Sequence, residues 1–138
     1  MTEPEGRVVV GVDGSPASLH ALRFAHRQAQ LTGAELHAVT TWAYPLSFDD
    51  PVDPTDWQAN AETILDTALA EALPADAAAG VRRHVAEGHP AGVLLGSVEA
   101  GDLLVVGSRG HGGFTGMLLG SVSQHVVAHS PCPVVVVR

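Results

Sequence analysis

Short runs of β-branched residues alternate with segments of helical periodicity along the chain, and this alternation is the strongest constraint on its fold. The apolar runs predict five β-strands, at residues 7–12, 35–42, 81–88, 102–108 and 133–138. Apolar residues at helical spacing predict helices over 16–32, 55–73, 90–99 and 121–129, with a break at 74–80. Strands that alternate with helices form parallel sheets. The sequence therefore predicts a single-domain α/β fold, an open five-stranded parallel sheet with helices on both faces.

Polar residues at the starts of three predicted helices fit hydrogen-bonded caps. Ser15 directly precedes a proline and is the expected cap of the first helix. Thr55 with Gln58, and Ser121 with Gln124, have the spacing of a capping box, in which two side chains satisfy backbone N–H groups.

The charged residues and the cysteine content exclude several functional classes. The net charge is −8, lysine is absent and all seven basic residues are arginines. Binding of nucleic acid is not expected, because it relies on many contacts from Lys and Arg to phosphates. The absence of lysine also excludes a GxxxxGK[ST] loop and Schiff-base chemistry. The single cysteine, Cys132, excludes an internal disulfide and favours buried packing.

The hydropathy pattern predicts a soluble protein. Apolar residues make up 46% of the chain, which is enough for a sizeable core. No apolar run approaches the ~18 residues that a membrane-spanning helix needs. The N-terminal sequence MTEPEGRVVV lacks the basic start and the apolar stretch of a signal peptide. We therefore expect a cytoplasmic protein that does not interact with membranes.

Two glycine-containing turns follow the carboxyl ends of predicted strands. Asp13-Gly14-Ser15 follows the first strand, and Gly107 ends the fourth. Open parallel sheets bind ligands at the carboxyl ends of their strands, where the strand order reverses. If the first and fourth strands are neighbours, the two turns face each other across one crevice. A missing Cβ at Gly107 would let a ligand lie against the backbone.

The fourth strand leads into a glycine-rich segment, residues 107–120, and its last glycine, Gly120, stands at the start of a predicted helix. A helix N-terminus has unpaired N–H groups and the positive end of the helix dipole, so it suits an anion. The hydroxyls of Ser121 and Ser123 would add donors. Without lysine, phosphate binding would rest on these groups and on Arg109. Mg²⁺ would be needed to offset the charge of a triphosphate, and Asp13 could hold this ion or a ribose hydroxyl.

The spacing Gly107-x2-Gly110-x9-Gly120-Ser121, directly after DLLVVG, resembles the nucleotide-binding signature of the universal stress protein family. The resemblance covers almost the whole chain, from VVVGVDGS near the start to GSVSQHVVAHSPCPVVVV near the end. It implies an adenine-nucleotide α-hydrolase-like fold with strand order 3-2-1-4-5. For the ATP-binding branch of the family it also implies binding of ATP, or of AMP or ADP, with little or no unaided hydrolysis.

The resemblance also implies a role for each residue of the signature. Asp13 would contact the nucleoside side, and the backbone of Thr41 would read adenine. Val106 and Gly107 would flank the ribose. Arg109 stands where the family often has histidine, and it could add a phosphate contact. The residues that would hold the phosphates are Gly110, Gly120, Ser121, Val122 and Ser123.

The apolar strand 133–138 would leave an unpaired backbone edge if it borders the sheet. Antiparallel pairing with the same strand of a second copy would cover that edge, and the family resemblance implies the same homodimer. An edge protected by twist and by Arg138 would instead leave a monomer. The most polar strand, 81–88, is expected near an edge and the most apolar, 102–108, near the centre.

These features predict a nucleotide-dependent sensor or regulator in the stress response that acts on an unknown protein partner. The first alternative is a slow ATPase or phosphoryl-transfer enzyme. Its base would have to come within hydrogen-bond reach of the reacting group, and loop position offers Asp13 and His111 alone for that role. The second alternative is an interaction module that does not bind nucleotides.

Each sequence feature also has a purely structural interpretation. The glycine-rich segment could be a mobile connection, and Asp13 could serve only to form a turn. His125 and His129 share a helix face but lack the glutamate of a zinc-protease motif, which favours plain surface histidines. The apolar residues within 111–119 predict packing over the site or against a second copy.

Overall fold

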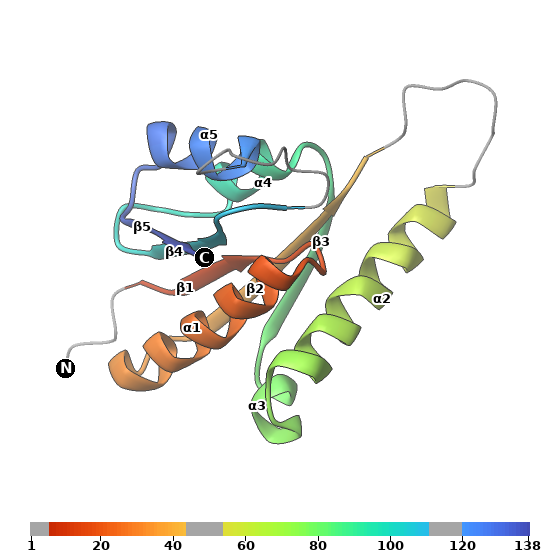
Figure 1. Cartoon of the computed structure of the whole chain (residues 1–138), viewed down its shortest axis with the longest axis horizontal. Helices are drawn as coiled ribbons and strands as arrows, with labels where there is room; N and C mark the ends of the chain where they lie inside the picture. Colours follow the sequence, from red (N-terminus) through yellow and green to blue (C-terminus); the bar gives the residue numbers. More distant parts are fainter. Residues whose placement is uncertain (1–5, 44–53, 111–119) are drawn as a thin grey trace.

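A computed structural model describes residues 6–43, 54–110 and 120–138. Over this part of the chain, five strands form one parallel sheet in the order β3-β2-β1-β4-β5 (Figure 1). The strands are Val8–Gly11 (β1), Leu36–Trp42 (β2), Arg82–Glu87 (β3), Leu103–Gly107 (β4) and Val134–Val137 (β5). The predicted fold class and strand order are confirmed. β3 and β5 form the edges as predicted, and β4 is an inner strand, paired with β1 and β5.

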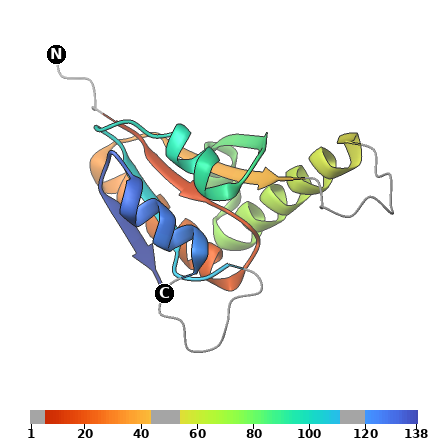
Figure 2. The ribbon, with the colours of Figure 1, turned by 90° about the horizontal axis from the view of Figure 1, so that it is seen from above.

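Helices cover both faces of the sheet. Within the described ranges they are Pro16–Thr32 (α1), Pro54–Ala72 (α2), Ala75–Ala79 (α3), Pro90–Gly96 (α4) and Ser121–His129 (α5). α1 and α2 lie on one face, and α4 and α5 lie on the other (Figures 1 and 2). None of the helices described here is both long and apolar enough to cross a membrane.

The sheet separates two apolar cores, because alternate residues of a strand point to opposite faces. Val10 of β1 belongs to the core under α1, together with Leu22. Val9, its neighbour, belongs to the core under α4 and α5, together with Leu94 and Val126. β1 is thus buried on both faces, which explains its uninterrupted apolar sequence.

The ends of α1 are those that the sequence predicts. Ser15 caps the helix, with its side-chain oxygen accepting a hydrogen bond from the N–H of Ser18 at 3.3 Å. Gly33 follows the helix with φ 74°, a left-handed conformation that glycine adopts without strain. The segment from β1 into α1 is therefore fixed by local sequence.

The start and the end of α2 differ from the sequence prediction. The helix begins at Pro54, one residue before the predicted cap Thr55, whose side chain lies outside the described residues, so the capping box stays a prediction. The side chain of Gln58 accepts a hydrogen bond from Trp42 Nε1 at 2.6 Å. The predicted break at 74–80 contains the short helix α3.

A buried carboxylate, Asp102, explains why α4 ends at Gly96 instead of reaching Glu99 as predicted. It accepts hydrogen bonds from the backbone N–H groups of Glu99 and Arg7, each at 2.8 Å, and from the Arg7 guanidinium at 2.8 Å. Burial alone would raise the pKa of Asp102, but these hydrogen bonds outweigh it and hold the pKa below its usual value. The chain after α4 is thereby turned back into β4.

Two histidines contact each other on the α4 face of the sheet. His37 Nδ1 of β2 lies 2.8 Å from His84 Nε2 of β3, with nearly parallel rings, so the two nitrogens share one hydrogen. Burial lowers the pKa of His37, and the nearby charge of Arg7 and the contact with His84 lower it further. The Glu35 carboxylate, 3.7 Å from His37 Nε2, acts in the opposite direction.

We expect this histidine pair to make the protein less stable in weak acid. Because the pKa of His37 in the folded state lies below its usual value of 6.5, the unfolded chain binds more protons there. The free energy of unfolding should therefore fall as the pH drops through 6.5. Urea unfolding from about pH 8 to about pH 5 measures this slope. His37→Gln should reduce the slope and His89→Gln, at an exposed histidine, should not. Equal slopes in the two variants would contradict this account.

Candidate functional site

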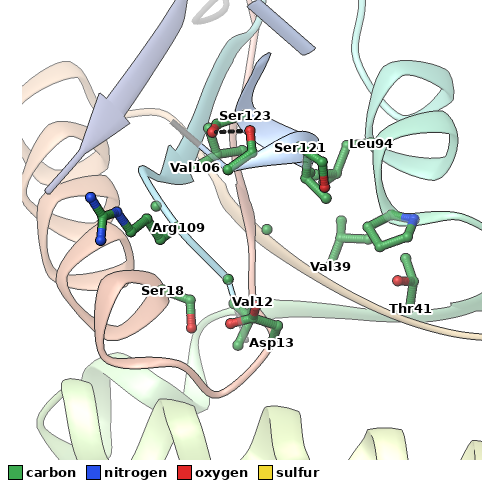
Figure 3. Close-up of a pocket in the computed structure, with 16 residues that line it drawn as sticks. Val12, Asp13, Ser18, Val39, Thr41, Leu94, Val106, Arg109, Ser121 and Ser123 are labelled. Carbon is green, nitrogen blue, oxygen red and sulfur yellow. Dashed lines mark hydrogen bonds between the residues drawn. The ribbon is translucent and has the colours of Figure 1, made fainter. Parts of the chain in front are cut away.

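A cavity of about 490 Å³ lies at the carboxyl ends of β1, β2 and β4 (Figure 3). Its volume is within the range of small-molecule sites. All residues that the sequence predicts for the site line this cavity: Asp13, Thr41, Val106, Gly107, Arg109, Gly110, Gly120, Ser121, Val122 and Ser123. The pairing of β1 with β4 brings together the two turns that the sequence could place face to face only by assumption.

The cavity has further lining residues that the sequence does not predict. Val39 lies two residues before Thr41 on β2, so strand alternation could have placed both on the same face. Pro90 and Leu94 come from α4, and no local motif indicates that α4 packs beside the site. The complete set of additional lining residues is Gly11, Val12, Ser18, Val39, Pro90 and Leu94.

The turn after β1 gives Asp13 a structural role. Its Oδ1 accepts a hydrogen bond from the N–H of Ser15 at 2.9 Å, which closes the turn. Its Oδ2 lies where it would come within 2.6 Å of a Cβ built on Gly110. The carboxylate thus holds the turn with one oxygen and approaches the glycine-rich segment with the other.

Hydrogen bonds join the two described ends of the glycine-rich segment, and we call this junction the base of the segment. The N–H of Gly120 donates to the carbonyl of Ser108 at 2.6 Å. The Ser123 hydroxyl lies 3.1 Å from the same carbonyl and 3.0 Å from the carbonyl of Gly120, the contact that is dashed in Figure 3. Residues 111–119, for which the sequence predicts packing over the site, lie outside the described residues.

The N-terminus of α5 corrects a cap that the sequence predicts. Gly120 is the N-cap residue, so Ser121 is the first helical residue and its side chain does not cap the helix. The N–H of Gln124 makes the first intrahelical bond, to the carbonyl of Gly120 at 3.0 Å. The backbone N–H groups of Ser121, Val122 and Ser123 therefore have no partner within the helix. These three residues line the cavity.

Gly107 is required by packing against α1. A Cβ at this position would lie 2.8 Å from both the carbonyl carbon and the Cβ of Ala17. Close approach of the helix therefore explains this glycine, where the sequence suggests close approach of a ligand.

The Arg109 side chain points away from the space between Asp13, Thr41 and Ser121 (Figure 3). The backbone of Arg109 still lies beside the part of the cavity between Gly110 and the start of α5, which we call the cradle. Its Cα would be 3.3 Å from a Cβ built on Gly120. The suggested contact between its guanidinium and phosphate is thus not prearranged in this conformation.

The histidines and acidic residues do not suggest a metal centre. Within the described ranges, no group of three or more His, Cys, Asp or Glu side chains is arranged to hold a metal ion. His125 and His129 lie side by side on α5 with ring centroids 4.5 Å apart, and both residues are exposed, as predicted for plain surface histidines. His111 lies outside the described residues.

The fold and the cavity define an open, doubly wound α/β protein with its site at the point where the strand order reverses. The model of the universal stress protein family (Usp) matches residues 5–138, and the chain belongs to this family.

Individual relatives agree with this assignment. The chain is 41% identical over 140 residues to a universal stress protein of Mycolicibacterium smegmatis (strain ATCC 700084 / mc(2)155). The matched region covers 95% of this chain and 45% of the relative. The chain thus spans less than half the length of these curated relatives.

Solved structures similar to this one include two universal stress proteins. The universal stress protein UspA from Lactobacillus plantarum, at 23% identity, has a TM-score of 0.77 and covers 99% of this chain and 100% of its own, which supports the fold. A universal stress protein crystallised in complex with cAMP is 29% identical, with a TM-score of 0.69 and coverage of 99% of this chain and 98% of its own.

Substitution of Gly107 tests the packing of the site against α1. Gly107→Ala should lower the free energy of unfolding by about 1–3 kcal/mol, because the added Cβ overlaps Ala17. Gly92→Ala is the matched control, since a Cβ there meets nothing within 4 Å. Because Gly92 lies in α4, that change should be neutral or stabilise by up to about 1 kcal/mol. Chemical denaturation measures both, and a Gly107→Ala protein as stable as the control would refute the packing explanation.

Proposed function

We propose that this protein binds an adenine nucleotide, specifically ATP together with Mg²⁺, and acts as a nucleotide-dependent sensor or regulator in the stress response. The observation that carries the proposal is the set of N–H groups at the start of α5 that have no partner within the helix. Their residues line the same cavity as an apolar wall from β2 and α4. This combination suits a ligand with an anionic end and a flat apolar end. A role that depends on cellular nucleotides implies a cytoplasmic location.

The adenine ring would lie against Val39 and Leu94. Both side chains line the cavity near Thr41 at the end of β2, on the side opposite Arg109 (Figure 3). Thr41 is among the last residues of β2. Its peptide groups would therefore lie near the adenine ring and could form hydrogen bonds with the polar edge of the ring. The ribose would lie beside Val106 and Gly107, between this wall and the start of α5.

The phosphates would be bound mainly by backbone N–H groups. The amides of Ser121, Val122 and Ser123 would face the anion from α5, and Gly110 would let it approach the opposite side. The Asp13 carboxylate supplies the kind of oxygen ligand that Mg²⁺ prefers. When bound, the ion would offset the negative charge that Asp13 and the phosphates otherwise place close together.

The relative crystallised with cAMP supports an adenine nucleotide as the ligand class. cAMP contains adenine, ribose and a single phosphate, so this likeness does not specify the number of phosphates. The choice of ATP rests on the spacing from Gly107 to Ser121 and on the extent of the N–H groups at the start of α5.

Calorimetric titration with ATP and Mg²⁺ tests the proposal directly. The wild-type protein should bind, and Gly110→Val should lose binding because its side chain would fill the cradle beside Asp13. Gly96→Ala is the control, since a Cβ at Gly96 meets nothing within 4 Å. An unchanged melting temperature in about millimolar ATP would instead favour an interaction module, because a ligand bound only by the folded state raises stability. Steady turnover that disappears in Asp13→Ala would favour an enzyme.

We also propose that two copies pair through β5. The Pro133 carbonyl accepts a hydrogen bond from the N–H of Leu104 in β4 at 3.0 Å, and the Val137 carbonyl accepts one from the N–H of Ser108, just after β4, at 2.7 Å. By strand alternation, the peptide groups of Val136 face away from β4, toward the open edge of the sheet. A second copy of the strand would satisfy these groups in a two-fold interface.

Removal of one edge N–H group tests this interface. Val136→Pro should convert the dimer to a monomer, because proline has no N–H to donate to the partner strand. Size-exclusion chromatography with light scattering measures the mass, and circular dichroism verifies that the variant is folded. Val127→Ser, at an exposed apolar residue of α5, is the control and should remain dimeric. A dimer that survives Val136→Pro but dissociates in Val127→Ser would place the interface on α5.

A further inference from the structure

We infer that Ser123 is a positioning residue for the proposed nucleotide site: its hydroxyl holds the two ends of the glycine-rich segment together and does not bind phosphate. This inference rests on the proposed function. It assigns the hydroxyl a different role from the one that the sequence suggests, in which Ser123 adds a donor to the phosphates.

The Ser123 side chain is turned into the protein. The residue is 2% exposed, and its Oγ lies 3.1 Å from the Ser108 carbonyl and 3.0 Å from the Gly120 carbonyl. Figure 3 shows this hydroxyl directed at the backbone, with the latter contact dashed. Ser108 and Gly120 lie at the two ends of the glycine-rich segment, so one hydroxyl bridges both of its ends.

The chemistry of a hydroxyl makes this bridge incompatible with a phosphate contact by the same group. A serine hydroxyl has a single hydrogen to donate, and here that hydrogen lies between two carbonyl oxygens. The remaining lone pairs of Oγ would repel a phosphate oxygen. The backbone N–H of Ser123 is a separate donor and stays available to the anion.

The bridge fixes the relative position of the two sides of the cradle. The Ser108 carbonyl also accepts the N–H of Gly120 at 2.6 Å, so the Ser123 hydroxyl reinforces this bond. A Cβ built on Gly120 would lie 3.6 Å from the N of Gly110, so the two glycines are close neighbours across the base. If the base opened, the amides of α5 would move away from Gly110. Ligand binding would then have to bring these amides back into place, and the free energy that this costs would reduce the affinity for phosphate.

The Ser108 peptide also connects the cradle to the edge of the sheet. Its N–H donates to the Val137 carbonyl at 2.7 Å, and its carbonyl receives the bonds from α5. The α5 end of the cradle is thus anchored to β5 through one peptide unit, which gives the hydroxyl of Ser123 a rigid acceptor.

Affinity measurements with nucleotides of different phosphate number test the inference. Ser123→Ala should weaken binding of ATP with Mg²⁺, and of AMP, by about tenfold, the effect of one lost buried hydrogen bond. Adenosine, which has no phosphate, should bind within about twofold of its wild-type affinity. Ser123→Thr keeps the hydroxyl and should restore the affinity. Ser97→Ala is the matched control, because its hydroxyl also donates to a backbone carbonyl, that of Val93 at 2.6 Å, outside the site. An equal loss of affinity for adenosine in Ser123→Ala would overturn the inference.

Amide hydrogen exchange in the absence of nucleotide separates positioning from direct binding. Ser123→Ala should speed exchange of the Gly120 N–H in the free protein, whereas Ser121→Ala, at an exposed hydroxyl, should not. Weaker nucleotide binding without faster exchange would make Ser123 a direct ligand and overturn the inference, as would unchanged affinity. If the wild-type protein bound no adenine nucleotide, the proposed function would fail and the positioning role with it. Faster exchange would then still demonstrate the bridge as a structural feature.

Discussion

The parallel pairing of β1 with β4 is the contact on which the rest of the site depends. It joins the two halves of the sheet at the point where the strand order reverses, so the turns after both strands end at one edge. β1 is buried on both faces, by Val10 on one side and Val9 on the other, and cannot shift its register without exposing one set. The positions of Asp13 and Gly107 relative to each other follow from this register.

Structural and binding requirements overlap at several residues of the site. Asp13 closes a turn with one oxygen and approaches the glycine-rich segment with the other. Gly107 lines the cavity, but its missing Cβ is required by α1. Gly120 both caps α5 and closes the base of the segment. A glycine or acidic residue at such a position is therefore weak evidence for a ligand by itself, and the convergence of these positions on one cavity is what supports binding.

The sequence predicts the elements well because apolar periodicity is a local signal. The predicted site residues line one cavity, and all of them except Thr41 lie in motifs at the ends of β1 and β4 or at the start of α5. Sequence prediction fails where a distant residue decides the structure. The early end of α4 depends on hydrogen bonds to Asp102 from Glu99 and from Arg7, which is far away in sequence. One local prediction also fails: Ser121 and Gln124 have the spacing of a capping box, yet Gly120, in an extended conformation, is the N-cap residue. Likewise, the wall from α4 depends on tertiary packing that no motif encodes.

The way the site would neutralise phosphate differs from that of a lysine-based loop. The chain has no lysine, a net charge of −8 and a carboxylate, Asp13, that approaches the cradle. Backbone N–H groups supply partial positive charge only, and each added phosphate increases the repulsion from Asp13. A mononucleotide with one phosphate needs little compensation, whereas a triphosphate needs a bound cation. If the proposed site binds adenine nucleotides, charge balance at Asp13 would therefore influence which of them it prefers.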